Sequence, residues 1–234
     1  MSGQLFVVPT PVGNLEDMTL RAVRVLKEAD VVLAEDTRTS GVLMKHFQID
    51  KPLKAYHQHN EHKITEELVN LIQQGRNVAL ISDAGTPGIS DPGFFLIRAA
   101  VAAGISVTTL PGATAFVPAL VSSALPCTAF TFIGFLPQKK GRQTRLKALA
   151  LEPHTLILYE SPYRLVKLLQ ELSEYLGSHR KAAVCREISK LHEEIARGTL
   201  HELHTTFAAR TVKGEIVVVV EGSVYSEPTN DEQD

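Results

Sequence analysis

The hydrophobic and polar positions in the first half of the chain alternate between two kinds of segment. Short apolar runs indicate buried strands, and between them apolar residues recur with helical spacing. Alternating strands and helices predict a parallel sheet that is covered by helices on both faces. The first domain is therefore expected to be an α/β domain over residues 1–112, with strands at 5–8, 31–33, 77–81 and 106–110 and helices at 19–29, 40–47, 65–74 and 94–103.

The second half of the chain has its own pattern of strands and helices. A helical segment at 115–124 persists despite Pro118, and Leu125-Pro126 ends it. A long amphipathic helix is expected at 162–176, with strands at 130–135, 155–159, 182–186, 194–197 and 215–220. We expect a second α/β domain over residues 113–225, joined to the first near residues 112–125, and a disordered acidic tail over residues 226–234.

Composition adds three limits. The chain of 234 residues has no run of about 18 apolar residues, so no membrane span is expected, and its first strand begins too early to leave room for a signal peptide. Two separated cysteines, Cys127 and Cys185, favour a reducing compartment such as the cytoplasm. The net charge of −2 gives no global positive field, but residues 139–147 carry five basic side chains and no acid.

The segment 82–93, SDAGTPGISDPG, is the most specific motif in the chain. It follows an expected buried strand and precedes an expected helix, where open α/β sheets bind ligands. Five of its twelve residues are Gly or Pro, which allow close approach of backbone to a ligand and fix the shape of the loop. We interpret the segment as a rigid, backbone-lined cradle. The alternative is a tight connection between strand and helix.

Two further loops follow strands in the same half. Residues 9–14, PTPVGN, have the position of a ligand loop, but they match neither the Walker pattern nor G-x-G-x-x-G. Residues 35–38, Glu-Asp-Thr-Arg, place three charged side chains where a cleft is expected. The alternative for this second loop is that Asp36 or Thr37 caps the next helix.

Residues 56–62, YHQHNEH, contain three histidines. Their spacing resembles a metal site, but nothing else in the chain supplies a fixed ligand set, so no metal is predicted. A substrate-facing loop is favoured over a solvated surface loop, with His57 or His59 available as a general base.

The second half contains three charged or glycine-containing turns next to expected strands. Residues 159–164, YESPYR, place Glu160 and Arg164 at a corner between strand and helix. Residues 186–194, REISKLHEE, follow another strand, and form either a site or a charged surface turn. Gly214 opens the last strand and would admit close approach of a ligand.

Taken together, these motifs resemble the 2′-O-ribose cytidine methyltransferases of the bacterial small ribosomal subunit, a branch of the tetrapyrrole methylase superfamily. The resemblance runs in order from about residue 4 to residue 221. One departure is that many members continue with a helical extension after the last strand, whereas this chain ends soon after Val220. The matching segments are PTPVGN (9–14), AEDTR (34–38), HNE (59–61), SDAGTPGISDPG (82–93), PGATA (111–115), YESPYR (159–164) and REISKLHEE (186–194).

The resemblance implies a fold and a methyl donor. It implies a parallel-sheet N-terminal domain and a mixed-sheet C-terminal domain, with S-adenosylmethionine bound in the cleft between them, and a homodimer. Carried over by matching motif, the donor-binding residues are Pro11, Gly85, Thr86, Pro87, Ile89, Thr114, Ala115, Tyr159, Glu187, Gly214, Glu215 and Ile216.

The resemblance also implies a substrate, the 16S rRNA in the small ribosomal subunit. A ribose hydroxyl is a poor nucleophile, so alignment and a general base are the expected sources of rate. The candidate bases are Glu35, Asp36, His59 and Lys190, of which the lysine requires a depressed pKa. Expected RNA contacts are Arg38, Arg164, Arg186, Lys139, Lys140, Arg142 and Arg145. The alternative for the basic run 139–147 is a solvated helix face.

Two other functions stay open. One is a tetrapyrrole or protein side-chain methylase, although such relatives usually have G-D-P where this chain has Gly85-Thr86-Pro87. The other is a non-catalytic RNA-binding assembly factor that only senses the donor.

Overall fold

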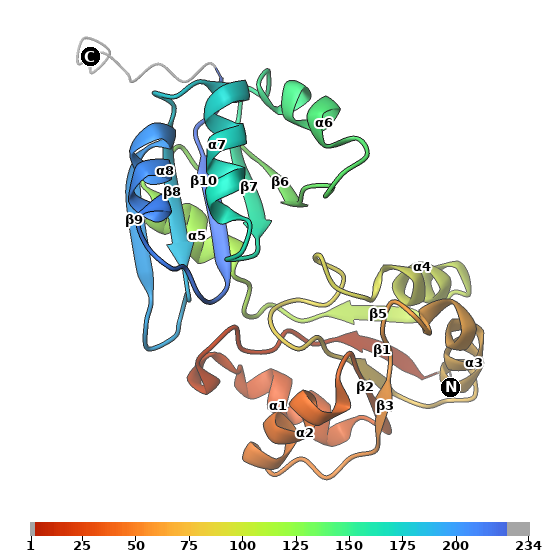
Figure 1. The fold of residues 1–234 in the computed structure, drawn as a ribbon. Helices are drawn as coiled ribbons and strands as arrows, with labels where there is room; N and C mark the ends of the chain where they lie inside the picture. The colour runs from red at the N-terminus through yellow and green to blue at the C-terminus, as the bar shows by residue number, and fades with distance from the viewer. Residues whose placement is uncertain (1–2, 224–234) are drawn as a thin grey trace, which may run out of the picture. The chain divides into compact units, whose positions relative to one another are not determined.

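The computed structural model describes residues 3–223, so the predicted acidic tail lies outside the described residues. The chain divides into two compact units after Thr114, and each unit has its own sheet and its own helices (Figure 1). Within the described part of the chain, no helix is long and apolar enough to cross a membrane.

The first unit is a five-stranded parallel sheet with the strand order β3-β2-β4-β1-β5. All of its strands run in one direction, so their carboxyl ends lie along one edge. The strands are β1 (Gln4–Val7), β2 (Val31–Ala34), β3 (Leu53–Ala55), β4 (Val78–Leu80) and β5 (Ser106–Thr109). The helices are α1 (Leu20–Glu28), α2 (Thr37–His46), α3 (Glu61–Gln73) and α4 (Phe94–Ala102), and a 3₁₀ turn covers Leu15–Asp17.

Side chains that alternate along the strands of this sheet build two apolar layers. In β2, Val32 and Ala34 pack in a cluster with Val25 of α1 and Met44 of α2, while Leu33 packs in a separate cluster with residues of α3 and α4. Successive side chains of a strand point to opposite faces, so a sheet covered on both faces needs nearly continuous apolar strands. The expected parallel sheet with two helical layers is confirmed.

The second unit is a mixed sheet, as expected, and its strand order is β6-β7-β10-β8-β9. β6 and β7 are parallel, and the remaining pairs are antiparallel. The strands are β6 (Phe130–Phe135), β7 (Thr155–Glu160), β8 (Lys181–Arg186), β9 (Glu194–Thr199) and β10 (Ile216–Val220). The helices are α5 (Phe116–Ser123), α6 (Arg142–Leu149), α7 (Leu165–Leu176) and α8 (Leu200–Ala208).

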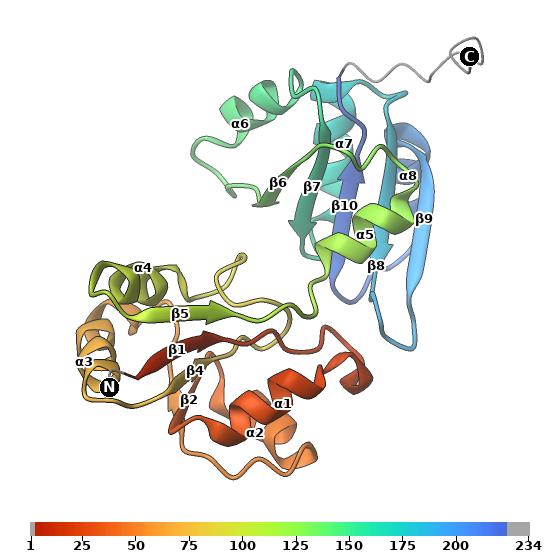
Figure 2. The same ribbon diagram turned by 180° about the vertical axis from the view of Figure 1, so that it is seen from behind.

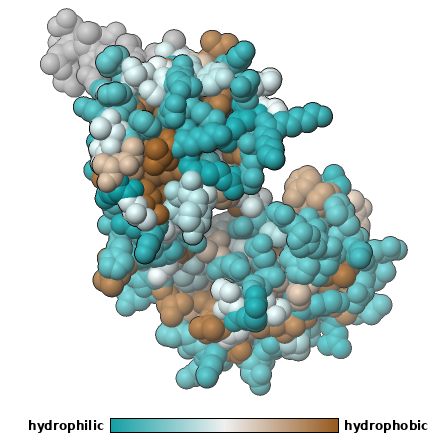
Figure 3. Space-filling view, viewed as in Figure 1, coloured by the Kyte–Doolittle hydropathy of each residue, from teal (hydrophilic) through white to brown (hydrophobic). Residues whose placement is uncertain are grey.

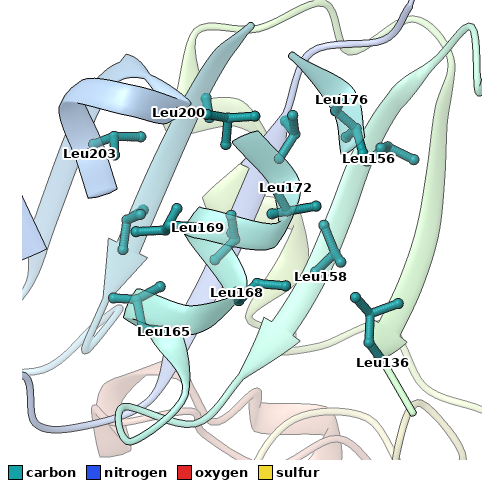
Figure 4. Packing of buried hydrophobic residues seen from close by; sticks show 14 of the residues in the cluster. Leu136, Leu156, Leu158, Leu165, Leu168, Leu169, Leu172, Leu176, Leu200 and Leu203 are labelled. Carbon is teal, nitrogen blue, oxygen red and sulfur yellow. The ribbon is translucent and has the colours of Figure 1, made fainter. Parts of the chain in front are cut away.

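The core of the second unit also has two layers. α7 contributes five buried leucines to a cluster that includes α6, α8 and one face of the sheet (Figure 4). α5 covers the other face, where Ala119 and Leu120 pack with Ile157, Cys185 and other strand residues (Figure 2). Burial raises the pKa of the Cys185 thiol to about 11, so this cysteine is a core residue rather than a reactive one.

Besides the 3₁₀ turn at Leu15–Asp17, three elements were not predicted from the sequence pattern. β3 is only three residues long and partly exposed, which leaves too little apolar pattern to detect. α8 carries a capping box, in which Thr199 and Glu202 satisfy each other's backbone donors, and this signal was present in the sequence. α6 begins within the basic run 139–147, for which a solvated helix face is only the alternative interpretation.

Candidate functional site

At the carboxyl edge of the parallel sheet, the loops after β1 and β4 are joined to each other. Thr10 N donates to Gly85 O at 2.9 Å, and Gly85 N donates to Thr10 O at 2.8 Å. The buried Thr10 hydroxyl also donates to Ser82 O at 2.9 Å. These bonds hold PTPVGN and SDAGTPGISDPG as one piece of structure.

The third loop, after β5, joins the same group. Thr86 Oγ1 donates to Ala113 O at 3.1 Å, and a Cβ on Gly112 would lie 2.8 Å from Pro9 Cβ. Gly85 has a φ of 81°, a left-handed conformation that favours glycine. Pro87 is buried, whereas Pro11 and Thr86 are half-buried and Ile89 is exposed. The loops therefore present backbone and small apolar groups around a fixed shape.

An acidic group with one histidine lies at the same edge. Asp36 N donates to Asp83 Oδ1 at 3.2 Å, so the loops after β2 and β4 meet. Burial is the main cause that raises the pKa of the Glu35 carboxyl, and the Asp83 charge adds to it, while His57 acts in the opposite direction. Among the described residues, no hydrogen bond to the Glu35 carboxylate is found, so its oxygens are available to a ligand.

Asp36 has a different environment. Its side chain caps α2 by accepting from Arg38 N at 2.8 Å, and it forms an ion pair with Arg38 Nη2 at 2.6 Å. The hydrogen bond from the Arg38 side chain lowers the pKa of Asp36 to about 2. Asp36 is thus a weak base that is already committed to Arg38, and the capping interpretation of this loop is confirmed.

The histidine loop is held by hydrogen bonds of the Asn60 side chain. Asn60 Oδ1 accepts from His57 N at 2.8 Å, and Asn60 Nδ2 donates to Ala55 O at 3.0 Å. His59 is exposed, with its ring 5.9 Å from that of His57, whose Nδ1 is buried without a partner. In residues 3–223, no group of three or more His, Cys, Asp or Glu side chains is placed to hold a metal ion.

In the second unit, an ionic cluster joins the end of β8 to the start of β10. Lys190 Nζ donates to Glu187 Oε1 at 2.9 Å and to Glu215 Oε2 at 3.2 Å. Glu187 Oε1 also accepts from Glu215 N at 3.0 Å. A Cβ on Gly214 would lie 2.4 to 2.5 Å from three atoms of the Glu187 side chain, so the glycine makes room for this carboxylate.

The cluster changes the basicity of its members. The Lys190 hydrogen bond is the main cause that lowers the pKa of Glu187. Burial pulls the pKa of Lys190 down, but its two carboxylate partners outweigh burial, and the pKa is raised. The depressed pKa that a lysine base requires is therefore not found, and we correct the expectation that Lys190 is a candidate base.

Tyr159 lies close to this cluster within the sheet. It pairs with Val217 of β10, the residue after Ile216, and its ring lies 5.2 Å from that of Phe132 and 5.6 Å from that of Phe135. Ile216 pairs with both Glu160 and Arg186. Five expected donor residues of the second unit, Tyr159, Glu187, Gly214, Glu215 and Ile216, are thus gathered at one end of the β7, β8 and β10 strands. The sixth, Ala115, precedes α5.

The arginines expected to contact RNA differ in their availability. Arg38 has a 90% exposed side chain despite its pair with Asp36. Arg186 is tied to Glu194 at 3.0 Å and to Lys213 O at 3.2 Å. Arg164 is half-buried at the start of α7. Of the three, Arg38 is the most accessible.

The structure contradicts the expectation that Arg142 contacts RNA. Its side chain is 8% exposed and forms an ion pair with Glu171 of α7 at 2.5 Å, and it donates to Pro137 O at 3.1 Å. An arginine that is committed in this way anchors α6 and is not an RNA contact. The sequence shows only a basic run, and an acidic partner 29 residues away has no local signal.

Arg142→Ala should lower the free energy of unfolding by about 2 kcal/mol, because it leaves the Glu171 carboxylate partly buried without its partner. Urea denaturation measures this change. Lys147→Ala, an exposed position on the same helix, should stay within about 0.5 kcal/mol of the wild type. An Arg142→Ala protein of unchanged stability and weakened RNA binding would contradict this assignment.

Sequence reasoning missed two members of these groups. Asp83 belongs to the loop after β4, three residues beyond the end of that strand, whereas Glu35 directly follows β2. Phe135 lies in a predicted strand, yet the residue is 59% exposed. Position after a strand was an available signal for Asp83, and nothing local distinguished Phe135 from buried strand residues.

Comparison with known proteins gives a consistent family. A family model described as tetrapyrrole (corrin/porphyrin) methylases matches residues 4–204. The protein named ribosomal RNA small subunit methyltransferase I from Synechocystis sp. is 50% identical over 222 residues, which cover 94% of this chain and 80% of that protein.

Solved structures have the same fold. A uroporphyrin-III C-methyltransferase from Thermus thermophilus is 27% identical, with a TM-score of 0.66 and 94% of each chain covered. A structure of the T. thermophilus enzyme complexed with S-adenosylhomocysteine is 22% identical, with a TM-score of 0.65, and the match covers 94% of this chain and 97% of that one. The chain therefore belongs to the tetrapyrrole (corrin/porphyrin) methylases, and within them to the ribosomal RNA small subunit methyltransferase I family.

Proposed function

We propose that this protein uses S-adenosylmethionine to methylate the 2′-hydroxyl of a cytidine ribose in 16S rRNA of the small ribosomal subunit. One observation carries the choice of substrate: identity reaches 50% over 94% of the chain with an rRNA methyltransferase I, but only 27% with a uroporphyrin-III methyltransferase. We further propose that the protein acts as a homodimer in the cytoplasm, where its substrate is assembled.

The residues of both units fit a donor of this chemistry. S-adenosylmethionine, when bound, supplies a methyl group on a positively charged sulfur. The joined loops of the first unit offer backbone N–H and C=O groups and small apolar surfaces, which suit an adenosine without strong charge. The second unit adds an aromatic ring and a carboxylate. The proposed donor-binding residues are Pro11, Gly85, Thr86, Pro87, Ile89, Thr114, Ala115, Tyr159, Glu187, Gly214, Glu215 and Ile216.

Glu35 is the proposed general base. Asp36 is paired with Arg38 and has a pKa of about 2, which makes it a poor proton acceptor. Lys190 has a raised pKa and is protonated. Glu35 keeps free oxygens and a raised pKa, and both properties favour proton removal from a hydroxyl. His59 is exposed and is retained as a second candidate.

The proposed RNA contacts are arginines and lysines that are exposed or half-buried. Arg38 lies near the proposed base, Arg164 lies at the start of α7, and Arg186 lies at the end of β8. Lys139, Lys140 and Arg145 are exposed around α6, whereas Arg142 is excluded by its pair with Glu171. Hydrophilic residues dominate the surface formed by α6 and the loop before it (Figure 3).

The test is methyl transfer from labelled S-adenosylmethionine to 30S subunits from cells that lack the enzyme, followed by mapping of the modified nucleotide. We expect label on the 2′-oxygen of one cytidine. Transfer to a uroporphyrinogen but not to 30S subunits would favour a tetrapyrrole methylase. Donor binding without transfer to any acceptor would favour a non-catalytic assembly factor.

A further inference from the structure

A groove lies between the edge strand β6 and helix α6. It encloses about 430 Å³, within the usual range for small-ligand sites, roughly 300–1,000 Å³. Ile133, Leu136 and Ala148 form apolar parts of its lining, and Phe135, Thr144 and Arg145 also face it. β6 pairs only with β7, so its other edge is left beside α6 (Figure 2).

The chemistry of the lining combines an accessible ring with positive charge. Phe135 is 59% exposed, although large aromatic side chains usually gain by burial. Residues of the basic run 139–147, which contains no acid, line one side of the groove. Within the described part of the chain, Arg142 alone among the five cations of this run forms an ion pair, so Lys139, Lys140, Arg145 and Lys147 keep their charge for an external anion.

The groove adjoins Tyr159, one of the expected donor residues of the same unit. Phe135 and Tyr159 are direct partners in the parallel ladder between β6 and β7, and their rings lie 5.6 Å apart. A ligand in the groove would therefore lie one strand away from Tyr159, which is proposed to bind the donor. A substrate group bound here would lie next to a residue that is proposed to bind the donor.

We propose that this groove binds an unpaired nucleotide of the RNA substrate next to the methylated cytidine, with its base stacked on Phe135 and its phosphate near Arg145. Stacking on an aromatic ring beside cations is how proteins bind single-stranded RNA. The apolar walls suit a base but not a hydrated phosphate alone. This proposal rests on the proposed function and identifies a substrate subsite for it.

The first test measures binding of a short labelled single-stranded RNA, and of the same RNA annealed to its complement, by fluorescence anisotropy. Phe135→Ala should weaken single-strand binding about tenfold, since one stacked base is lost, and should leave duplex binding nearly unchanged. Phe135→Tyr, which keeps the ring, should restore affinity. Phe130→Ala is the matched control, since Phe130 is a 41% exposed ring at the other end of β6. An equal loss for both RNAs, or no loss, would overturn the proposal.

The phosphate contact has its own measurement. Arg145→Ala should reduce the slope of log affinity against log salt by about 0.7, the value for one single-strand phosphate contact. Lys167→Ala, an exposed lysine on the neighbouring α7, should leave the slope unchanged. Equal slopes for the wild type and Arg145→Ala would remove Arg145 from the proposed site.

Methyl transfer to 30S subunits distinguishes a failure of the groove proposal from a failure of the proposed function. Phe135→Ala should raise the KM for 30S about tenfold while the affinity for S-adenosylmethionine stays at the wild-type value. Normal kinetics of Phe135→Ala, with an active wild type, would refute the groove alone. A wild type that methylates no 30S subunit would refute the proposed function. Impaired methylation with unchanged single-strand affinity would mean that the groove contacts another ribosomal component, and would also overturn the proposal.

Discussion

Glu35→Gln should lower kcat for methyl transfer to 30S subunits by about 10²–10⁴-fold at neutral pH, the usual contribution of a general base. Glutamine keeps the size and the polar character of the side chain but cannot accept the proton of the ribose hydroxyl. The affinity for S-adenosylmethionine should stay within about twofold, because Glu35 is not among the proposed donor contacts. Single-turnover kinetics and calorimetric donor binding measure the two quantities.

The pH profile makes this prediction more specific. A base must be deprotonated, so the wild-type rate should fall as pH falls through the pKa of Glu35. Because burial and Asp83 raise that pKa, the decline should begin at a higher pH than an ordinary glutamate would give. Glu35→Gln should lose this limb of the profile. If the limb persists in Glu35→Gln and disappears in His59→Gln, the base is His59.

Stability provides the control for folding. A carboxyl whose pKa is raised in the folded state destabilises the fold when it is ionised, and this cost is present above that pKa. Glu35→Gln should therefore be at least as stable as the wild type at neutral pH. The exposed Glu66→Gln, on α3 of the same unit, should match the wild type in both rate and stability. A loss of stability in Glu35→Gln would attribute its lost activity to misfolding.

Gly214→Ala should weaken S-adenosylmethionine binding at least about tenfold. The new Cβ would lie 2.4 to 2.5 Å from Glu187, and the φ of 90° at this position is already strained for alanine. Glu187 must move, which breaks its bonds to Lys190 Nζ and Glu215 N. The shape at the ends of β8 and β10 changes with it. Calorimetry with S-adenosylmethionine measures the loss.

Gly177→Ala separates backbone strain from steric displacement. Gly177 has a φ of 105°, but a Cβ there meets nothing within 4 Å. This control should lose about 1 kcal/mol of stability and keep wild-type donor affinity. If Gly214→Ala binds the donor as well as Gly177→Ala does, the ionic cluster is structural and takes no part in donor binding.

The parallel sheet of the first unit was predictable because its central strands β2 and β4 are buried on both faces. Val31 to Ala34 and Val78 to Leu80 are apolar without interruption, and only a doubly covered strand tolerates this pattern. The short edge strand β3 escaped prediction because all three of its residues are partly exposed. Its existence follows from pairing with β2, which a local pattern does not record.

The position of the candidate site was predictable from the sequence, but the ion pairs that its residues form were not. Motifs at strand ends located Glu35, Asp36 and Glu187, since connection rules fix where loops gather. Partnership depends on contacts between distant residues. Arg142 with Glu171, and Lys190 with Glu215, decide which charges are free for a substrate and which bases are too weak. Charge type alone does not reveal these pairs.

The register shift in β6 has a consequence for how the protein behaves at high concentration. Between Phe132 and Gly134 the strand contains one residue more than its partner β7, and Gly134 adopts a φ of 66°. Such a bulge bends and twists an edge strand, which makes its outer side a poor template for another chain. The second unit can therefore keep one edge of its sheet unpaired, beside a helix, without promoting edge-to-edge aggregation.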